Sequence, residues 1–429
     1  MANQNPETTA EQQSHAVADF GIDHVQQSTK EQLKAYLGRF KSGADLGLAP
    51  ALLALAILTA VFGIRNPDAF LSKFNFGNYW QQAAPICMLA MGVTFVLLVG
   101  EIDLGAGYTA GVCAAVLALR LKGGTPLIVA ILLALIVAIL IGALNGWLVA
   151  RVGIPSFIVT LSGFLGWQGV LLLLSKEGGT IRVQDRTIVA IENSNLSVAL
   201  GWALWAVVTF GFAAIALSRA RTRRVGGLSG ETLGTVIGKV AGIGVVFGLA
   251  VWQLNEPRGA NGLRGVPVAV PIIIAIACVL TFFLSRTSWG RHLYAVGGNA
   301  EAARRAGINV MRIKMSAFIV CSMLACIAGF ILASRLNSVA PDTGGNDTLL
   351  IAVGAAVIGG TSLFGGRGRI VNAIIGGLVF ALINNGLPLL GKAGPFDFTD
   401  AGLKFVINGL VLLGFASIDA LSRKRSATA

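Results

Sequence analysis

The chain has 429 residues, of which 55% are hydrophobic and only 12% are charged, and its formal net charge is +13. Soluble domains carry about 25% charged residues, so this composition is too apolar to cover the core of a soluble protein. It predicts an all-α polytopic membrane protein. The basic balance argues for positively charged inner loops and against nucleic-acid binding, because no basic stripe is interleaved with stacking aromatics.

The N-terminal region is polar and precedes the first apolar run. Residues 1–29 lack the charged and apolar regions of a signal peptide, so we expect a disordered cytoplasmic tail there. Residues 30–45 place Leu33, Leu37 and Phe40 on one helical face and lysines on the other. Two interpretations fit this amphipathic helix: it lies on the anionic inner leaflet, or it packs on the body of the protein.

Residues 46–425 form the predicted transmembrane domain, with about 10–12 membrane-spanning helices. Residues 126–150 contain no charged side chain, and as a helix they are long enough to cross a hydrocarbon layer of ~30 Å. The candidate spans in chain order are 48–65, 80–100, 102–121, 126–150, 155–175, 197–218, 234–254, 266–285, 313–336, 347–364, 370–391 and 400–421. The glycine-rich spans 102–121 and 347–364 are candidates for broken or re-entrant segments.

The distribution of basic residues predicts the orientation of the chain, because Lys and Arg favour the cytoplasmic side. Twelve crossings that start inside place the arginine-rich segment 218–224, the long basic loop 286–314 and the C-terminal SRKR on the inner side. The loops NEPRGANG and APDTGGND, which carry acid, Pro and Asn, then fall outside. We therefore expect both the N- and the C-terminus to be cytoplasmic.

A weak internal repeat relates two glycine-rich strings that each end an apolar run. VGEIDLGAG (99–107) aligns with IGGTSLFGG (358–366), and an Asn–Gly pair follows in each half, at 145–146 and 385–386. Transporters are commonly built from such repeats, with the substrate handled at their interface. A parallel two-fold duplication and a chance similarity between glycine-rich strings both fit this pattern.

The residues give no support to catalytic or metal-binding chemistry. Two of the three histidines, His15 and His24, lie in the N-terminal tail, and the third lies in a basic loop. The five cysteines lie in apolar segments without metal-ligand spacing, so we expect no metal and no other cofactor. The string GLPLLGKA (386–393) imitates a phosphate loop but ends in Ala393, where Ser or Thr would hold Mg²⁺. We therefore do not expect the chain to be an enzyme.

Glu101 and Asp103 stand out because carboxylates next to hydrocarbon are costly. They are two residues apart in GEIDLGAG, a string that suits a glycine-bent turn better than a paired-carboxylate site. An ion-coupled secondary transporter that uses both acids is one interpretation, and a membrane scaffold or receptor without flux is another. Their position at the end of a segment, rather than in mid-span, weighs against ion coupling.

The predicted inner loop 286–314 contains a short helix. Asn299 is a favourable N-cap, AEAARRA supplies strong helix formers, and Gly307 suits the C-terminal cap. Docking on a partner would cover the alanine face of this helix and let Arg304 and Arg305 reach carboxylates. A solvated basic loop would need no partner, and the spacing alone leaves both interpretations open.

Four strings occur in a recognisable order along the chain: GEIDLGAG, NGWLVARVGIPSFIVTLSG (145–163), GRHLYAVGGNAEAARRAGI (290–308) and VIGGTSLFGGRG (357–368). Together they resemble the permease subunits of bacterial ABC importers for monosaccharides, and an insertion beginning SRARTRRVGG is similar to the xylose-type subgroup. The resemblance implies a permease homodimer in the cytoplasmic (inner) membrane. It further implies ATP hydrolysis on separate ATP-binding subunits, an extracytoplasmic sugar-binding protein, and xylose or a related monosaccharide as substrate.

The resemblance also implies two sets of site residues. The loop at 290–308 is similar to the family's coupling region, which contacts the ATPase, and its candidate residues are Gly298, Asn299, Ala302, Ala303, Arg304, Arg305 and Gly307. A hydroxyl-rich sugar needs hydrogen-bond partners without tight binding, and the candidates for its translocation path are Glu101, Asp103, Asn145, Thr361, Ser362 and Asn385. For Asp103, a role in the path and a role as the cap of the next helix both fit.

Overall fold

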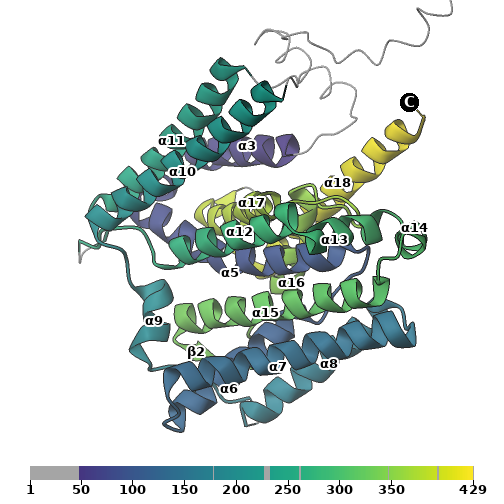
Figure 1. The fold of residues 1–429 in the computed structure, drawn as a ribbon. Coiled ribbons are helices and arrows are strands. Elements are labelled where there is room, and N and C mark those ends of the chain that lie inside the picture. The colour runs from purple at the N-terminus through teal and green to yellow at the C-terminus, as the bar shows by residue number, and fades with distance from the viewer. Residues whose placement is uncertain are drawn as a thin grey trace, which may run out of the picture. The chain divides into compact units, whose positions relative to one another are not determined.

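The computed structural model describes residues 48–176, 178–226, 232–259, 262–345, 347–393 and 396–428. The tail predicted for residues 1–29 and the amphipathic helix predicted for residues 30–45 lie outside the described residues. Figure 1 shows that the described chain is almost entirely helical. It divides into two compact units, a smaller one that contains Trp202–Trp252 and a larger one built from Gly43–Gly201 and Gln253–Ala429.

The smaller unit is formed by two helices, α10 (Val198–Val225) and α11 (Leu233–Asn255). The indole N–H of Trp205 on α10 donates a hydrogen bond of 2.8 Å to the carbonyl oxygen of Gly244 on α11. Gly248 lets the same ring lie close to α11, since a Cβ there would stand 3.0 Å from the indole nitrogen. The tryptophan ring therefore joins the two helices through an apolar contact and a satisfied N–H.

The larger unit contains the other elements. Its helices are α3 (Ala49–Arg65), α4 (Pro67–Phe70), α5 (Lys73–Leu98), α6 (Ala106–Lys122), α7 (Leu127–Trp147), the π-helix η1 (Leu148–Val152), α8 (Ser156–Leu174), α9 (Arg186–Asn193), α12 (Ala269–Arg286), α13 (Ser288–Gly298), α14 (Ala300–Arg305), α15 (Val310–Leu336), α16 (Asp347–Ile358), α17 (Ile370–Leu389) and α18 (Ala401–Thr428). Two-residue strands make two antiparallel pairs, β1 (Ile181–Arg182) with β2 (Ser338–Val339) and β3 (Lys392–Ala393) with β4 (Phe396–Asp397). The predicted all-α class is confirmed.

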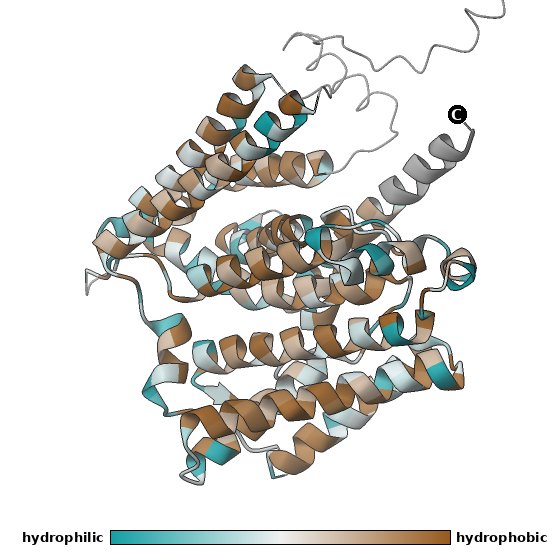
Figure 2. Cartoon of the chain, in the orientation of Figure 1, coloured by the Kyte–Doolittle hydropathy of each residue, from teal (hydrophilic) through white to brown (hydrophobic). Residues whose placement is uncertain are grey.

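Eight of the described helices are long and apolar enough to cross a membrane: α5, α7 with η1, α8, α10, α11, α12, α15 and α17. Several of them expose apolar residues, and Figure 2 shows that α7 is hydrophobic along most of its length. On α7, the exposed residues include Leu132, Ile136 and Leu140. Such a contiguous apolar surface is accounted for by contact with lipid, because soluble monomers rarely expose one. A multi-pass membrane protein follows from these helices.

The twelve predicted spans each overlap a helix, but three of these helices, and the apolar part of a fourth, are shorter than the eight above. Helices α3 and α6 have 17 residues each, α16 has 12, and the apolar part of α18 covers Ala401–Ser417. At about 1.5 Å per residue, α16 extends only ~18 Å, less than a hydrocarbon layer of ~30 Å. The twelve-crossing topology and the inner position of both termini therefore stay predictions.

The core of the larger unit forms around α15, which lies between α5 and α7 (Figure 1). Small residues let these backbones approach closely. On α7, Gly142 faces the backbone of Ile319 and Gly146 faces Met315, both on α15. Close packing through glycine stabilises helix pairs in lipid, where no hydrophobic driving force acts between them.

Candidate functional site

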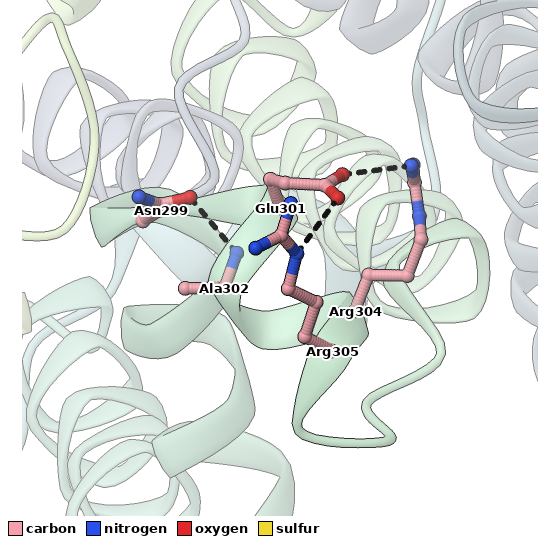
Figure 3. A network of polar contacts seen from close by, with 5 residues as sticks. All are labelled: Asn299, Glu301, Ala302, Arg304 and Arg305. Atoms are coloured by element: carbon pink, nitrogen blue, oxygen red, sulfur yellow. Dashed lines mark hydrogen bonds and ion pairs between the residues drawn. The ribbon is translucent and has the colours of Figure 1, made fainter.

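The predicted coupling segment folds as two short helices, α13 and α14, between α12 and α15. The side-chain oxygen of Asn299 accepts a hydrogen bond of 2.9 Å from the backbone N–H of Ala302 and caps α14 (Figure 3). Gly307 follows the helix with a φ of +82°, in the left-handed region that favours glycine. The predicted short helix and both of its caps are confirmed. Helix α13 was not predicted from the sequence.

Most coupling candidates lie at the surface of the described chain. Ala303 is buried, whereas the exposed candidates are Gly298, Asn299, Ala302, Arg304, Arg305 and Gly307. Arg304 and Arg305 each pair with Glu301 at 3.2 Å, and their side chains are 68% and 80% exposed (Figure 3). Such exposed pairs contribute little to stability because both ions keep most of their water. A carboxylate on another protein can therefore replace Glu301 at little cost.

The end of α13 meets the two glycine-rich turns of the sequence. The backbone N–H of Gly366 donates a hydrogen bond of 2.9 Å to the carbonyl oxygen of Leu98, the last residue of α5. A Cβ on Gly297 would stand 2.6 Å from the Gly366 nitrogen and closer still to the Leu98 oxygen. A Cβ on Gly365 would stand 2.6 Å from the Gly297 oxygen and 3.0 Å from the Gly100 nitrogen. We call Gly100, Gly297, Gly365 and Gly366 the glycine junction, where three backbones touch without intervening side chains.

The two turns leave their helices through the same hydrogen-bond pattern. In each, the N–H of a left-handed glycine bonds to the carbonyl three residues back, and the next N–H bonds to the carbonyl five residues back. These glycines are Gly100 after α5 and Gly360 after α16, with φ of +77° and +90°. The geometry therefore pairs Gly100 with Gly360, one residue away from the sequence alignment with Gly359. Helix α14 ends in the same common motif, so the pattern alone does not establish a duplication.

Glu101 and Asp103 lie in the turn between α5 and α6, in different surroundings. The carboxylate of Glu101 forms an ion pair with the ammonium group of Lys314, in the second turn of α15. Asp103 is fully buried, and its Oδ1 accepts a hydrogen bond of 2.9 Å from the N–H of Gly105. Its Oδ2 makes no hydrogen bond of standard geometry among the described residues, and the Ala106 N–H and the Cys321 thiol also lie against this carboxylate. The Gly105 contact closes a turn just before α6, so the cap role and the path role of Asp103 both stay predictions.

Three other path candidates lie near the same end of this unit. Thr361 and Ser362 belong to the turn that enters the glycine junction, and they are 1% and 2% exposed. Asn145 lies in the last turn of α7, where α7 packs on the first turns of α15, and it is 2% exposed. The Thr361 hydroxyl and the Asn145 Nδ2 find no hydrogen-bond partner among the described residues. All three residues are therefore buried polar groups, and two of them keep unused hydrogen-bonding capacity.

Asn385 does not join this group. It exchanges two hydrogen bonds of 2.9 Å with Asn75, near the start of α5, and is 5% exposed. The turn with Glu101 follows the opposite end of α5, a helix of 26 residues that is ~39 Å long at about 1.5 Å per residue. The structure therefore brings five path candidates to one end of the unit and places Asn385 near the other.

An open cleft of about 600 Å³ is lined both by Arg304 of α14 and by Glu101 in the turn after α5. Its polar lining includes Glu101, Arg304, Asn309 and Lys314, and its apolar lining includes residues from 149–155. Lys314 is the functional candidate that sequence reasoning missed. The signal that points to it is a lysine placed four residues inside an apolar helix, where only a nearby acid would compensate it.

A second residue that sequence reasoning missed is a buried carboxylate, whose backbone contacts Gln81 of α5. Glu192 on α9 is 1% exposed, and neither carboxylate oxygen has a hydrogen-bond partner among the described residues. Its backbone N–H donates to Ser334 at 2.9 Å, and the side chain of Gln81 donates to its carbonyl oxygen at 2.6 Å. Burial raises the pKa of Glu192 to about 8, although the guanidinium of Arg335 lowers it in part. Nothing in the sequence around this acid distinguishes it from an exposed loop residue.

Comparisons with known proteins place the chain in one family. The family described as "Branched-chain amino acid transport system / permease component" matches residues 75–416. The xylose transport system permease protein of Escherichia coli K12 is 33% identical over 392 residues, 91% of this chain and 96% of that protein. The protein of the same name from Haemophilus influenzae is 35% identical over 376 residues, 87% of this chain and 96% of its own. The ribose import permease protein of Bacillus subtilis is 30% identical over 397 residues, 92% of this chain and 99% of its own. No solved structure matches the chain.

Proposed function

The chain belongs to the permease family of bacterial ABC importers, and from that premise we propose that it is the membrane conduit for a monosaccharide, with xylose as the first candidate. The xylose relatives are 33% and 35% identical to it over most of both chains, and a ribose relative is 30% identical. In such importers ATP hydrolysis lies on a separate subunit, so this chain is not itself the enzyme. Because ATP then supplies the driving force, transport does not need ion coupling through Glu101 and Asp103.

The ATP-binding subunit docks on α14 in this proposal. Supporting it are the exposed alanine and arginine side chains of α14, whose only charged contact in the described chain is the weak pairing with Glu301. The glycine junction passes a displacement of this segment to both turns, because no flexible side chain lies between the backbones. The proposal puts the segment between α12 and α15 in the cytoplasm together with both termini, as the basic loops favour.

The sugar passes the polar candidates at the inner end of the larger unit, after passing Asn385 near the outer end. A substrate that must leave again needs hydrogen-bonding groups of moderate strength, which the amides, hydroxyls and carboxylates of these residues supply. All of them except Glu101 are buried in the described conformation, so helices move apart when sugar passes. By family resemblance, two copies of the chain form a homodimer, and a sugar-binding protein delivers the substrate from outside.

A parallel internal duplication is part of the proposal. Its support is that the turns at 99–107 and 358–366 each follow a helix through the same cap and meet at the glycine junction. Repeats of this kind commonly place the substrate path where the two halves meet.

The test is reconstitution in lipid vesicles with the ATP-binding subunit and a loaded binding protein, with xylose, ribose and leucine as parallel substrates. We expect uptake of xylose, or of the related sugar, that requires ATP, and no leucine uptake. Leucine uptake would make the chain an amino-acid permease within the same family. A second set of vesicles holds the chain alone under an imposed proton or sodium gradient. Sugar accumulation there, without any ATPase, would refute the proposal in favour of ion coupling.

A further inference from the structure

We propose that Lys314 is a positioning residue for transport, whose ion pair with Glu101 links the coupling helix α14 to the turn after α5. The inference rests on the proposed function, because it assigns a role in the coupling between ATP hydrolysis and transport. The two residues are 213 positions apart in the sequence, so the pair is a long-range contact between two segments that are not neighbours along the chain. It also lines the cleft that Arg304 of α14 enters.

The pair is shielded from water, unlike the pairs on α14. The side chains of Lys314 and Glu101 are 22% and 14% exposed, whereas that of Glu301 is 57% exposed. Charges attract each other more strongly where less water surrounds them, and removing one partner leaves the other charge partly buried and unpaired. The Lys314–Glu101 pair is therefore the firm connection in this region, and the α14 pairs are the exchangeable ones.

The chain path connects Lys314 mechanically to α14. Only the four residues 306–309 separate the end of α14 from the start of α15, and Lys314 lies in the second turn of α15. A displacement of α14 by a docked subunit therefore acts on the first turns of α15. Through the ion pair, the same displacement acts on Glu101.

Glu101 passes a displacement on to buried polar groups. Both backbone polar groups of the neighbouring Ile102 are hydrogen-bonded to α8: its N–H donates to the Ser156 hydroxyl and its carbonyl oxygen accepts from the Thr160 hydroxyl, each at 3.2 Å. Asp103 follows directly and is the buried path candidate of this turn. Movement of Glu101 thus changes the position of Asp103 rather than being lost in a loose loop.

Arg304 gives this link two alternative arrangements. It lines the same cleft as Glu101 and Lys314 but pairs with Glu301 in the described conformation. When a carboxylate of the ATP-binding subunit engages α14, Arg304 exchanges Glu301 for that carboxylate, while Lys314 keeps its contact with Glu101, an acid that lines the cleft. An element with two discrete pairings is the kind that switches rather than deforms continuously.

The experiment measures sugar molecules transported per ATP hydrolysed, in vesicles that contain the complete importer. The variants are Lys314→Met, Lys314→Arg, Glu101→Gln, the exchange Glu101→Lys with Lys314→Glu, and the matched control Lys392→Met. Lys392 also pairs with an acid, Asp397 at 3.7 Å, but is 82% exposed and far along the chain from α14. We expect Lys314→Met and Glu101→Gln to lower the ratio about tenfold, within the usual range of allosteric coupling, while ATP hydrolysis persists. The exchange variant regains at least half of the ratio, and the control keeps it.

Three results would overturn the inference. A wild-type ratio in Lys314→Met shows that the pair is not needed, and a failed recovery in the exchange variant shows that charge pairing is not the cause. The third is an equal loss in Lys314→Arg, which retains the charge and is expected to stay near the wild-type ratio. If the wild-type complex shows no ATP-dependent uptake, the proposed function fails as well. Normal wild-type transport with a normal Lys314→Met ratio refutes only the role of this pair.

Discussion

Substitution of Gly297 by alanine tests whether the glycine junction needs bare backbone. The added Cβ would stand 2.6 Å from the Gly366 nitrogen and closer to the Leu98 oxygen, so the hydrogen bond between those two groups must lengthen or break. Overpacking costs about 1–3 kcal/mol, and a lost hydrogen bond about 0.5–1.5 kcal/mol. Alanine regains about 1 kcal/mol of helix propensity, which leaves an expected net loss of about 0.5–3.5 kcal/mol.

Gly298→Ala is the matched control, because a Cβ there meets no heavy atom within 4 Å among the described residues. The assay is the midpoint of thermal unfolding in detergent, followed by ATP-dependent uptake in vesicles. We expect Gly297→Ala to unfold at a lower temperature and to transport poorly, and Gly298→Ala to unfold at or above the wild-type temperature. Equal midpoints for the two variants would refute the close backbone packing.

Further predictions concern three buried polar groups. Asp103→Asn keeps an acceptor for the Gly105 N–H, so we expect it to fold and to lose transport, whereas an Asn variant with normal uptake would show that the residue only caps α6. Asn75→Ala leaves the buried amide of Asn385 without its partner, and Asn385→Ala leaves the Asn75 Oδ1 without one while its Nδ2 keeps the Phe70 carbonyl; each should cost about 1–3 kcal/mol in unfolding free energy, and the double variant should cost less than the sum of the two. Burial raises the pKa of Glu192 to about 8, above its value in the unfolded chain, so ionisation destabilises the fold increasingly as pH rises towards 8. Glu192→Gln should therefore unfold close to wild type at about pH 4.5 and at a higher temperature than wild type at about pH 8.5, and a gap that does not change with pH would contradict this.

The positions of the helices could be predicted from the sequence, because an apolar run long enough for a membrane has few alternatives. The ends of the helices could not be predicted as well. The span expected at 347–364 ends at Ile358, where Gly360 adopts a left-handed conformation and the chain turns towards the glycine junction. Hydropathy continues through such a turn, so it does not mark where the helical hydrogen bonds stop.

In the candidate site, too, local features could be predicted from the sequence and long-range contacts could not. The caps of α14, Asn299 and Gly307, could be predicted because each acts within one turn of the helix. The pairing of Glu101 with Lys314 could not, since it depends on how α15 packs against the end of α5. The sequence predicts Asn385 as one path candidate among six, and the structure pairs it with Asn75, at the end of α5 opposite to the other five.

Thiol labelling and cross-linking at Ala302, an exposed residue of α14, test most directly whether ATP hydrolysis drives import through α14. A variant with Ala302→Cys, in which the exposed Cys278 is replaced, is placed in membrane vesicles of both orientations together with its ATP-binding subunit. We expect an impermeant thiol reagent to label position 302 only from the cytoplasmic face, and a short cross-linker to join it to the ATP-binding subunit and stop ATP-driven uptake. Labelling of position 302 from the outer face, or uptake that continues at full rate in the cross-linked complex, would contradict an importer driven through α14.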